Sequence, residues 1–293
     1  MGYGDDIMAT GDAKTARAEH PNAKVVFADP DNPFHNEKGK ARLHWSIVYE
    51  NNPNILQPGE DAEDLLVIPI FPGSRPYINY EKSRYATLGD SSDKIPIKIA
   101  YNRDFQAPRG ELYFTADEIA KAEEAVAGLK PPIAVIEPLT KGANNKAWIW
   151  ERWQEVVEQS DCTFVQLGAD DDIPWLDGVQ KIVTPSFREA CAILAVCKNT
   201  GFFLGTDGGL HHAAAAIGLP AIVLWSHYSH PDNLGYEDHV NIRWDAAGSP
   251  CGLREPCIQC QRSMEMIKVN DVLVAIGIVK GNNLKGSARQ TSA

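Results

Sequence analysis

The fold is decided by the stretch GTDGGLHHAAAAIGLPAIVLW, residues 205–225. It predicts a tight glycine turn, a helix and a buried strand, directly after a short apolar strand. Glycines in the turn let the backbone approach a ligand closely. The expected pieces are a strand at Phe202–Leu204, a turn at Asp207–Gly209, a helix continuing through Ala213–Ile217, stop signals at Gly218 and Pro220, and a strand at Ala221–Trp225.

A glycine turn that opens a helix offers free N–H groups and the positive end of the helix dipole, an arrangement that suits a phosphate. His211 and His212 stand on the first turn and are candidate donors to the same anion. Two adjacent histidines cannot share one helix face, so we expect at most one to point into a site. The alternatives stay open, since most such turns bind no phosphate and a histidine here also fits the core or the solvent.

The composition indicates a globular protein of one large or two ordinary domains, with 293 residues and 44% hydrophobic content. A net charge of −11 argues against a general nucleic-acid binder and against a large basic surface on anionic lipid. Residues 74–109 hold seven basic side chains among tyrosines, which we interpret as a solvated face, with a local binding patch as the alternative. These residues are Arg75, Lys82, Arg84, Lys94, Lys98, Arg103 and Arg109.

The apolar runs are too short for a transmembrane helix, and the start of the chain does not resemble a signal peptide. Three of the six cysteines, Cys162, Cys191 and Cys197, lie in apolar segments and are typical of small core residues. We therefore expect a cytoplasmic protein.

The first half predicts a mixture of helices and strands, and the second half alternates strand and helix. That alternation predicts an α/β fold with a parallel sheet and right-handed crossovers. In the first half we expect helices at Ile7–Ala18 and after the capping box at Thr115, strands at Lys24–Ala28, Leu65–Ile70 and Ile95–Ala100, and a loop over 29–42. In the second half we expect further strands at Ile133–Ile136 and Thr163–Leu167, and helices at Trp148–Gln159, Phe187–Cys197 and Val269–Ile276. Lys130-Pro131-Pro132 marks the boundary between domains 1–130 and 131–280, and residues 281–293 are predicted to be a disordered tail.

Two further segments carry candidate site residues. The first, GYGDDIMATG at 2–11, places Asp5 and Asp6 at a helix N-terminus, either as helix caps or with a general base among them. The second, TKGANNKAWIWERW at 140–153, places Lys141 and Lys146 between a strand and a helix, where open α/β sheets bind ligands. A lysine there neutralises a diphosphate, unless it is an ordinary surface lysine.

The segment CGLREPCIQC spaces Cys251, Cys257 and Cys260 as Cys-x5-Cys-x2-Cys. Three thiolates with His239 or His230 would form a zinc site. The paired CxxC pattern of zinc sites is absent, so the sequence favours reduced thiols and no metal.

In this order, the segments resemble the family 9 glycosyltransferases, the ADP-heptose:lipopolysaccharide heptosyltransferase-like proteins. That family opens with a Gly-x-Gly-Asp loop and helix, followed by His-Pro-x-Ala; residues 2–5 and 20–23 match these two patterns. A Lys-x-Trp-x4-Trp segment is matched by Lys146, Trp148 and Trp153. An Asp-x-Gly-x-x-His-x-Ala-Ala segment is matched by Asp207, Gly209, His212, Ala214 and Ala215.

The resemblance implies two Rossmann-like domains facing each other across a cleft, the GT-B arrangement, with the acceptor on 1–130 and the donor on 131–280. It implies an inverting enzyme without a bound metal. Because the family places a strand before the first loop, which here begins at residue 2, the first domain is predicted to lack that strand. By carry-over, Asp5 is the general base; Lys146, Thr206, Asp207, Gly208, Gly209, Leu210 and His212 bind the donor; and Gly4, Asp6 and Lys141 contact acceptor or phosphate.

The resemblance further implies a nucleotide-diphosphate sugar as substrate, with ADP and a heptose among the candidates, and no cofactor. The acceptor is a glycan, a lipid-linked molecule or another hydroxyl compound, and a location at the inner membrane face is compatible with it. Two alternatives stay open: a nucleotide-sugar-binding protein without turnover, and another GT-B enzyme such as a sugar-nucleotide epimerase.

Overall fold

The computed structural model describes residues 2–28, 43–69, 75–87, 94–140, 144–244 and 248–290. Its second half is built on a six-stranded, all-parallel sheet in the order β11-β10-β9-β6-β7-β8. The strands are β6 (Ile133–Glu137), β7 (Thr163–Gly168), β8 (Gln180–Val183), β9 (Gly201–Thr206), β10 (Ala221–Trp225) and β11 (Val240–Arg243). The predicted parallel α/β sheet is therefore confirmed.

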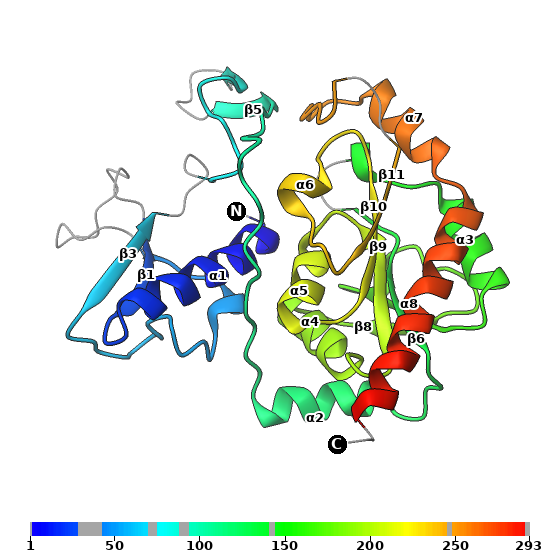
Figure 1. Cartoon of the computed structure of the whole chain (residues 1–293), viewed down its shortest axis with the longest axis horizontal. Helices are drawn as coiled ribbons and strands as arrows, with labels where there is room; N and C mark the ends of the chain where they lie inside the picture. Colours follow the sequence, from blue (N-terminus) through cyan, green and yellow to red (C-terminus); the bar gives the residue numbers. More distant parts are fainter. Residues whose placement is uncertain are drawn as a thin grey trace.

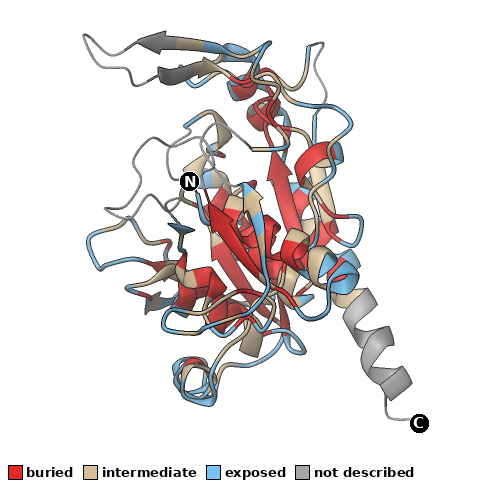
Figure 2. Cartoon of the chain, turned by 90° about the vertical axis from the view of Figure 1, so that its left-hand side faces the viewer, coloured by how far each residue is buried: buried red, intermediate tan, exposed pale blue. Residues whose placement is uncertain are grey.

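Both faces of this sheet are covered, so its central strands are buried throughout (Figure 2). Figure 1 shows α3 and α8 on one face and α4 and α5 on the other. Alternate residues of one strand enter different cores: Val135 packs with α4 and α5, whereas Ile136 packs with α3 and α8. The four helices are α3 (Trp150–Gln159), α4 (Phe187–Val196), α5 (Gly209–Ile217) and α8 (Val269–Gln290).

The first half begins with α1 (Tyr3–Glu19) and a three-stranded sheet in the order β2-β1-β3. Its strands are β1 (Lys24–Ala28), β2 (Leu43–His44) and β3 (Leu65–Pro69). β1 pairs along its whole length with β3, and its other edge meets β2 and a bridge to Ile55. The predicted loss of a strand before α1 implies exposed apolar faces and open hydrogen-bonding edges in this sheet, and Leu65 and Val67 on the edge strand β3 are 49% and 58% exposed. Both edges of β1 are nevertheless occupied.

A hairpin of β4 (Arg84–Thr87) and β5 (Lys94–Lys98) projects from the first half and reaches the second. The backbone N–H of Ile99 donates to the carbonyl of Gly252 at 2.8 Å, and that of Arg254 donates to Ile97 at 3.0 Å. Gly252 has φ +61°, and a Cβ there would lie 1.9 Å from the Ile99 carbonyl oxygen. Only glycine therefore permits this close approach.

The two halves share one core. Apolar side chains of α1 and β1 pack in the same cluster as those of α4, α5, β9 and β10. α2 (Ala116–Ala125) also lies against α4. Arg188 on α4 is 5% exposed; it pairs with Glu118 of α2 and donates to the carbonyls of Ile47 and Tyr113. These contacts fasten three segments of the first half to one helix of the second.

The capping box at Thr115 is confirmed, with Thr115 and Glu118 exchanging hydrogen bonds. α1 starts at Tyr3, four residues before the expected start, because the Gly2 N–H donates to the Asp5 carboxylate and caps the helix early. The sequence missed β2, β4, β8, β11, the 3-10 turns Ile47–Tyr49 and Asn144–Lys146, α6 (Pro231–Leu234) and α7 (Ile258–Met266).

The end of the chain differs from the expected disordered tail. α8 continues to Gln290, since no proline interrupts its backbone ladder after Ile276. Residues 291–293 and the whole of the predicted loop 29–42 lie outside the described residues. Within the described residues, every helix is too short or too polar to cross a bilayer.

Candidate functional site

The site is built where the path of the chain through the large sheet reverses. The chain runs outward from β6 through β7 to β8, then returns to lay β9 on the other side of β6. The carboxyl ends of β6 and β9 therefore lie side by side, and helices leave them in opposite directions. Ligands of open α/β sheets bind in the crevice at such a reversal. Here the crevice begins with Glu137 on β6 and with Thr206 and Asp207 at the end of β9.

Asp207 and Lys146 form an ion pair in this crevice. Lys146 Nζ lies 2.8 Å from Asp207 Oδ2 and 3.2 Å from the Asp207 carbonyl oxygen. The Ser229 hydroxyl donates to the same carboxylate oxygen, and the Tyr228 ring lies 5.1 Å from the ammonium. Burial by itself raises the pKa of Asp207, yet Lys146 and His211 hold it well below its ordinary value. Asp207 is therefore ionised, and Lys146 is held in place by it.

Glu137 is a second carboxyl group beside this pair. Burial raises its pKa from 4.5 to about 8; Lys146 lowers it and Asp207 raises it further. The group is therefore mostly protonated at neutral pH and offers an O–H donor. An ideal Cβ on Gly208 would lie 3.6 Å from Glu137 Oε2, which places the acid beside the glycine turn.

The turn itself matches the sequence prediction, with Gly208 as the N-cap of α5 and Gly218 as its left-handed C-cap. His211 is fully buried: the Gly208 N–H donates to Nδ1 at 3.1 Å, and Nε2 lies 2.9 Å from the Leu234 carbonyl. Burial lowers its pKa, which keeps the ring neutral and fits one donated and one accepted bond. His211 is thus a core histidine.

His212 is also buried, and its Nδ1 lies 2.8 Å from the Tyr236 hydroxyl. Burial and the neighbouring His211 hold its pKa well below the ordinary value. Thr206 and Leu210 are 2% and 4% exposed, and the Leu210 side chain packs in the shared core. Leu210 can therefore contact a bound sugar nucleotide only through its backbone.

Asp5 lies on α1, the first-half helix that packs against α5. The Tyr77 hydroxyl donates to Asp5 Oδ1 at 2.6 Å, and Arg75 Nε lies 3.2 Å from Oδ2. Burial raises the pKa of Tyr77 well above its ordinary value, so the phenol stays a donor. Asp5 thus caps its helix and also faces a site: it borders a pocket of about 240 Å³. The pocket is lined by Asp5, Met8, Ala9, Asp12, Ile68, Pro69, Arg75, Pro76, Tyr77 and Phe105.

The structure separates the other first-half candidates from this pocket. Asp6 is 3% exposed and accepts from His44 at 2.9 Å and from Tyr49 at 3.3 Å, so it joins α1 to the segment that follows β1. Gly4 lies against α5, where an ideal Cβ would be 2.7 Å from Cδ2 of His212. Lys141 lies outside the described residues.

Aromatic rings join the Asp5 pocket to the Lys146 pair. Tyr77 stacks on Tyr101 at 6.3 Å between centroids, and Tyr101 meets Tyr228 edge-on at 6.4 Å. Tyr228 then covers the Lys146 ammonium. The sequence favours a solvated face for the basic and aromatic stretch 74–109, with a local binding patch as the alternative. That interpretation is wrong for Arg75, whose side chain is 17% exposed and bound to Asp5.

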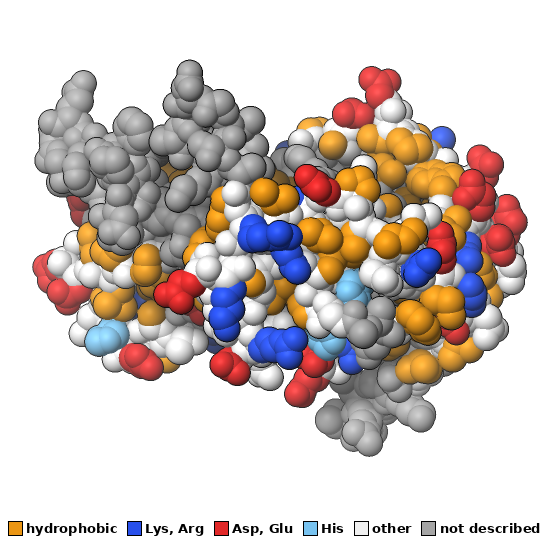
Figure 3. Space-filling model, turned by 90° about the horizontal axis from the view of Figure 1, so that it is seen from above, with side chains coloured by type: hydrophobic (Ala, Val, Ile, Leu, Met, Phe, Trp, Pro, Cys, Tyr) orange, Lys and Arg blue, Asp and Glu red, His pale blue; other side chains and the backbone are white. Residues whose placement is uncertain are grey.

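Sequence reasoning missed Glu137, Tyr77, Tyr228 and Ser229 as site residues. Glu137 had a usable signal, because a charged residue ends an otherwise apolar strand at the edge where ligands bind. Tyr228 and Ser229 follow β10 by three and four residues and carried no comparable pattern. The surface seen from above intersperses basic and acidic side chains and has no continuous basic area among its described residues (Figure 3).

Comparison with known proteins supports the fold. No family profile and no curated protein sequence matches the chain. Among solved structures, a glycosyl transferase family 9 protein from Veillonella parvula superposes with a TM-score of 0.59 at 14% identity, covering 95% of this chain and 94% of its own. The chain therefore has the fold of that protein.

Two E. coli structures are also similar over part of the chain. ADP-heptose lps heptosyltransferase II gives a TM-score of 0.46 at 17% identity over 61% of this chain. Heptosyltransferase WaaC with ADP-2-deoxy-2-fluoro heptose gives 0.38 at 18% identity over 60%. The matched part of this chain spans 54% and 52% of their lengths, about half of each.

Proposed function

We propose that the chain is an inverting glycosyltransferase that moves a sugar from a nucleotide-diphosphate donor to an acceptor hydroxyl. The observation that carries the proposal is the row of rings between Asp5 and Lys146. Tyr77 donates to Asp5 at one end, and Tyr228 covers Lys146 at the other. A continuous row of ring contacts thus connects a carboxylate suited to a base with a cation suited to a diphosphate. The fold shared with the family 9 structure supports the same reaction class.

In the proposed reaction, Asp5 removes the proton of an acceptor hydroxyl as that oxygen attacks C1 of the sugar. The bond from C1 to the diphosphate oxygen breaks on the opposite face, which inverts the anomeric centre. Lys146 and the N–H groups at Gly209 and Leu210, in the first turn of α5, stabilise the charge that develops on the leaving diphosphate. Glu137, protonated at neutral pH, is a further donor beside the turn. The step uses no metal and no cofactor.

Donor binding and acceptor binding are assigned to different halves of the chain, each with its own sheet. We assign donor binding to residues 131–280 and acceptor binding to residues 1–130, in a GT-B arrangement. An ADP-linked heptose is the first donor to try, because the Lys146 and Asp207 segments resemble those of the ADP-heptose transferase family. The acceptor class is a glycan, a lipid-linked molecule or another hydroxyl compound. Six free cysteines fit a reducing compartment, so we place the reaction in the cytoplasm, with the inner membrane face as one setting.

A nucleotide-sugar-binding protein without turnover is the second candidate, and one observation favours it. Both oxygens of Asp5 already accept hydrogen bonds or ionic contacts, from Tyr77, Arg75 and the Gly2 backbone. These three contacts occupy most of the roughly four lone-pair positions of the carboxylate. Binding without turnover follows if the acceptor hydroxyl cannot reach the position that is left.

Two measurements test the proposal in sequence. Thermal shift against a panel of nucleoside diphosphates and their sugars identifies the donor, since a ligand at 100 times its Kd stabilises by about 2.7 kcal/mol. The donor found is then incubated with glycan and lipid-linked acceptors, and also with water alone to detect hydrolysis. Transfer with inversion supports the enzyme, and binding without release of nucleotide supports the second candidate. A chain that binds nothing in the panel contradicts both.

A further inference from the structure

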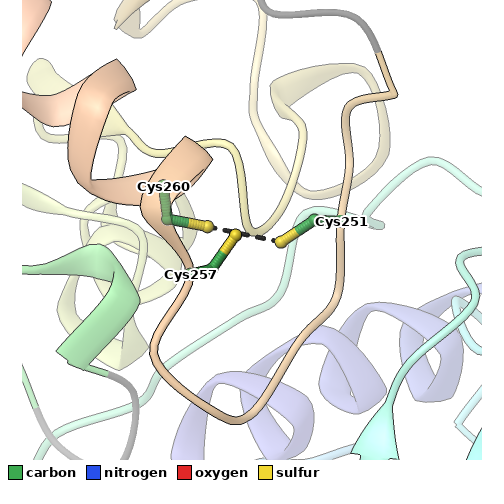
Figure 4. Close-up of side chains that lie close together, drawn as sticks. All are labelled: Cys251, Cys257 and Cys260. Atoms are coloured by element: carbon green, nitrogen blue, oxygen red, sulfur yellow. Dashed lines mark hydrogen bonds between the residues drawn. The ribbon is translucent and has the colours of Figure 1, made fainter.

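The loop between β11 and α7 brings three cysteine sulfurs together. Figure 4 shows Cys257 and Cys260 at the start of α7 and Cys251 on the opposite side of the loop, with all three side chains pointing inward. The sulfur atoms lie within 4.8 Å of one another, and those of Cys251 and Cys260 are 3.3 Å apart. From the sequence we expected reduced thiols without a metal, because the spacing lacks a paired motif. The spacing did not show that the loop folds back on itself.

The sulfur positions fit a metal ion. With Zn–S bonds of about 2.3 Å and tetrahedral angles, thiolate sulfurs around one Zn²⁺ lie about 3.8 Å apart. The Cys251–Cys260 separation of 3.3 Å lies somewhat below that value, and the upper limit of 4.8 Å for all three pairs lies above it. Small shifts of side chains would suffice, because the three Cβ–Sγ bonds already converge (Figure 4). We propose that Cys251, Cys257 and Cys260 bind one Zn²⁺ ion as thiolates.

The surroundings suit a bound ion. Cys260 is fully buried and Cys251 is 8% exposed, while Cys257 is half-buried and gives the ion a path of entry. Backbone bonds fix the loop from outside, with the Cys251 N–H donating to the His227 carbonyl at 2.8 Å. No fourth side-chain ligand joins the cluster among the described residues. The fourth position of a tetrahedral ion therefore goes to water or to a small added ligand.

The ion would hold the segment that carries Lys146. The Asn145 side chain donates to the carbonyls of Leu253 and Glu255 at 2.7 and 2.8 Å, and it accepts from the Cys257 N–H at 3.0 Å. Tyr228, which covers Lys146, packs against Cys251 and Cys260. Tightening the cysteine loop thus fixes both neighbours of the lysine. The role is structural and lies outside the transfer step.

The test is elemental analysis of the reduced, full-length chain after incubation with Zn²⁺ and removal of excess metal. We expect one Zn²⁺ per chain, and an intense thiolate-to-metal absorption band when Co²⁺ replaces it. Cys257→Ser should weaken Zn²⁺ binding by about 100-fold or more, the upper end of what loss of an outer-shell partner causes. Cys162→Ser is the matched control, because Cys162 is also half-buried but lies outside the cluster. It should bind metal like the native chain.

If Cys257→Ser fails to fold, the rate at which Cys257 is alkylated in the native chain tests Zn²⁺ binding instead. Zn²⁺ should slow iodoacetamide modification of Cys257 and leave that of Cys162 unchanged. Native chain that retains no Zn²⁺, or that is alkylated at Cys257 equally fast with and without it, overturns the proposal. Stoichiometric iron in place of zinc, or a disulfide among the three cysteines of the protein as isolated, overturns the assignment to Zn²⁺.

Discussion

The ammonium of Lys146 is paired with the carboxylate of Asp207 at 2.8 Å, across the ends of two neighbouring elements. The pair is mostly buried, with the two side chains 19% and 5% exposed. Lys146 is therefore positioned before any ligand arrives, but part of its charge is already balanced. A diphosphate gains from this lysine mainly through a hydrogen bond of fixed direction.

Lys146→Ala should weaken ADP binding by about 1.5–3 kcal/mol, through the loss of one charge-assisted hydrogen bond. Isothermal calorimetry with ADP measures the change. Lys198→Ala is the control, because Lys198 is exposed and lies beside Gly218 at the far end of α5. ADP affinity that is equal in the two variants contradicts the placement of the diphosphate. The melting temperature is measured in parallel, since Asp207 loses its partner.

Asp5→Asn should lower the transfer rate by about 10²–10⁴-fold, because asparagine cannot take up the acceptor proton. Capping of α1 should survive, since Asn caps a helix about as well as Asp. The expected result is a near-native melting temperature, near-native donor binding and a large fall in kcat.

Asp6→Asn is the comparison for Asp5→Asn. Asp6 is buried between His44 and Tyr49, so its substitution should lower the melting temperature first. Activity lost in Asp6→Asn should follow the fraction of folded protein. Equal falls in kcat for the two folded variants would assign Asp5 to capping alone.

Glu137 should make the free energy of unfolding fall as the pH rises from 7 to 8. Its folded pKa of about 8 lies above its ordinary 4.5, so the folded chain holds a proton that the unfolded chain has lost. This stabilisation is complete below pH 4.5 and is lost as the pH rises through 8. The slope is at most about 1.4 kcal/mol per pH unit. Denaturant unfolding of Glu137→Gln should show a flatter profile over this range; an unchanged slope would show that another group is responsible.

Gly4→Ala should destabilise the chain by about 1–3 kcal/mol, because the added methyl group meets His212 at 2.7 Å. Alanine otherwise favours a helix over glycine, so a net loss identifies the contact between α1 and α5. Gly277→Ala is the matched control, since Gly277 also lies inside a helix, α8, and a Cβ there would meet nothing within 4 Å. Thermal unfolding of both variants decides the matter. A Gly4→Ala chain as stable as the native one would mean that α1 and α5 separate easily.

Local signals in the sequence predicted the larger elements well. The strand Ala221–Trp225 has the expected bounds, because a continuous apolar run between a proline and a polar loop leaves few alternatives. The short edge strand β8 was missed, since its residues are mostly exposed and follow no apolar pattern. Element ends also shifted where side chains capped them, as Asp5 does for α1.

The sequence predicted individual segments of the candidate site, but not the contacts between residues far apart in the chain. The glycine turn and Lys146 each carry a local signal, and a rule for open sheets places them near one edge. The pairing of Arg75 and Tyr77 with Asp5 joins residues about 70 positions apart and depends on the path of a loop. The three cysteines converge for the same reason, because the loop closes on β5 and Ile99 through backbone bonds that leave no sequence pattern apart from Gly252.

The contacts of Arg188 and the core around it have a consequence for cooperativity. A division at residue 130 separates two sheets, but it cuts through one continuous apolar interior. A fragment of residues 131–280 would leave Arg188 without Glu118 and would expose the faces of α4 and α5 that α1 and α2 cover. The two sheets therefore depend on the same apolar core for their stability. We expect heat to unfold both sheets in a single cooperative transition.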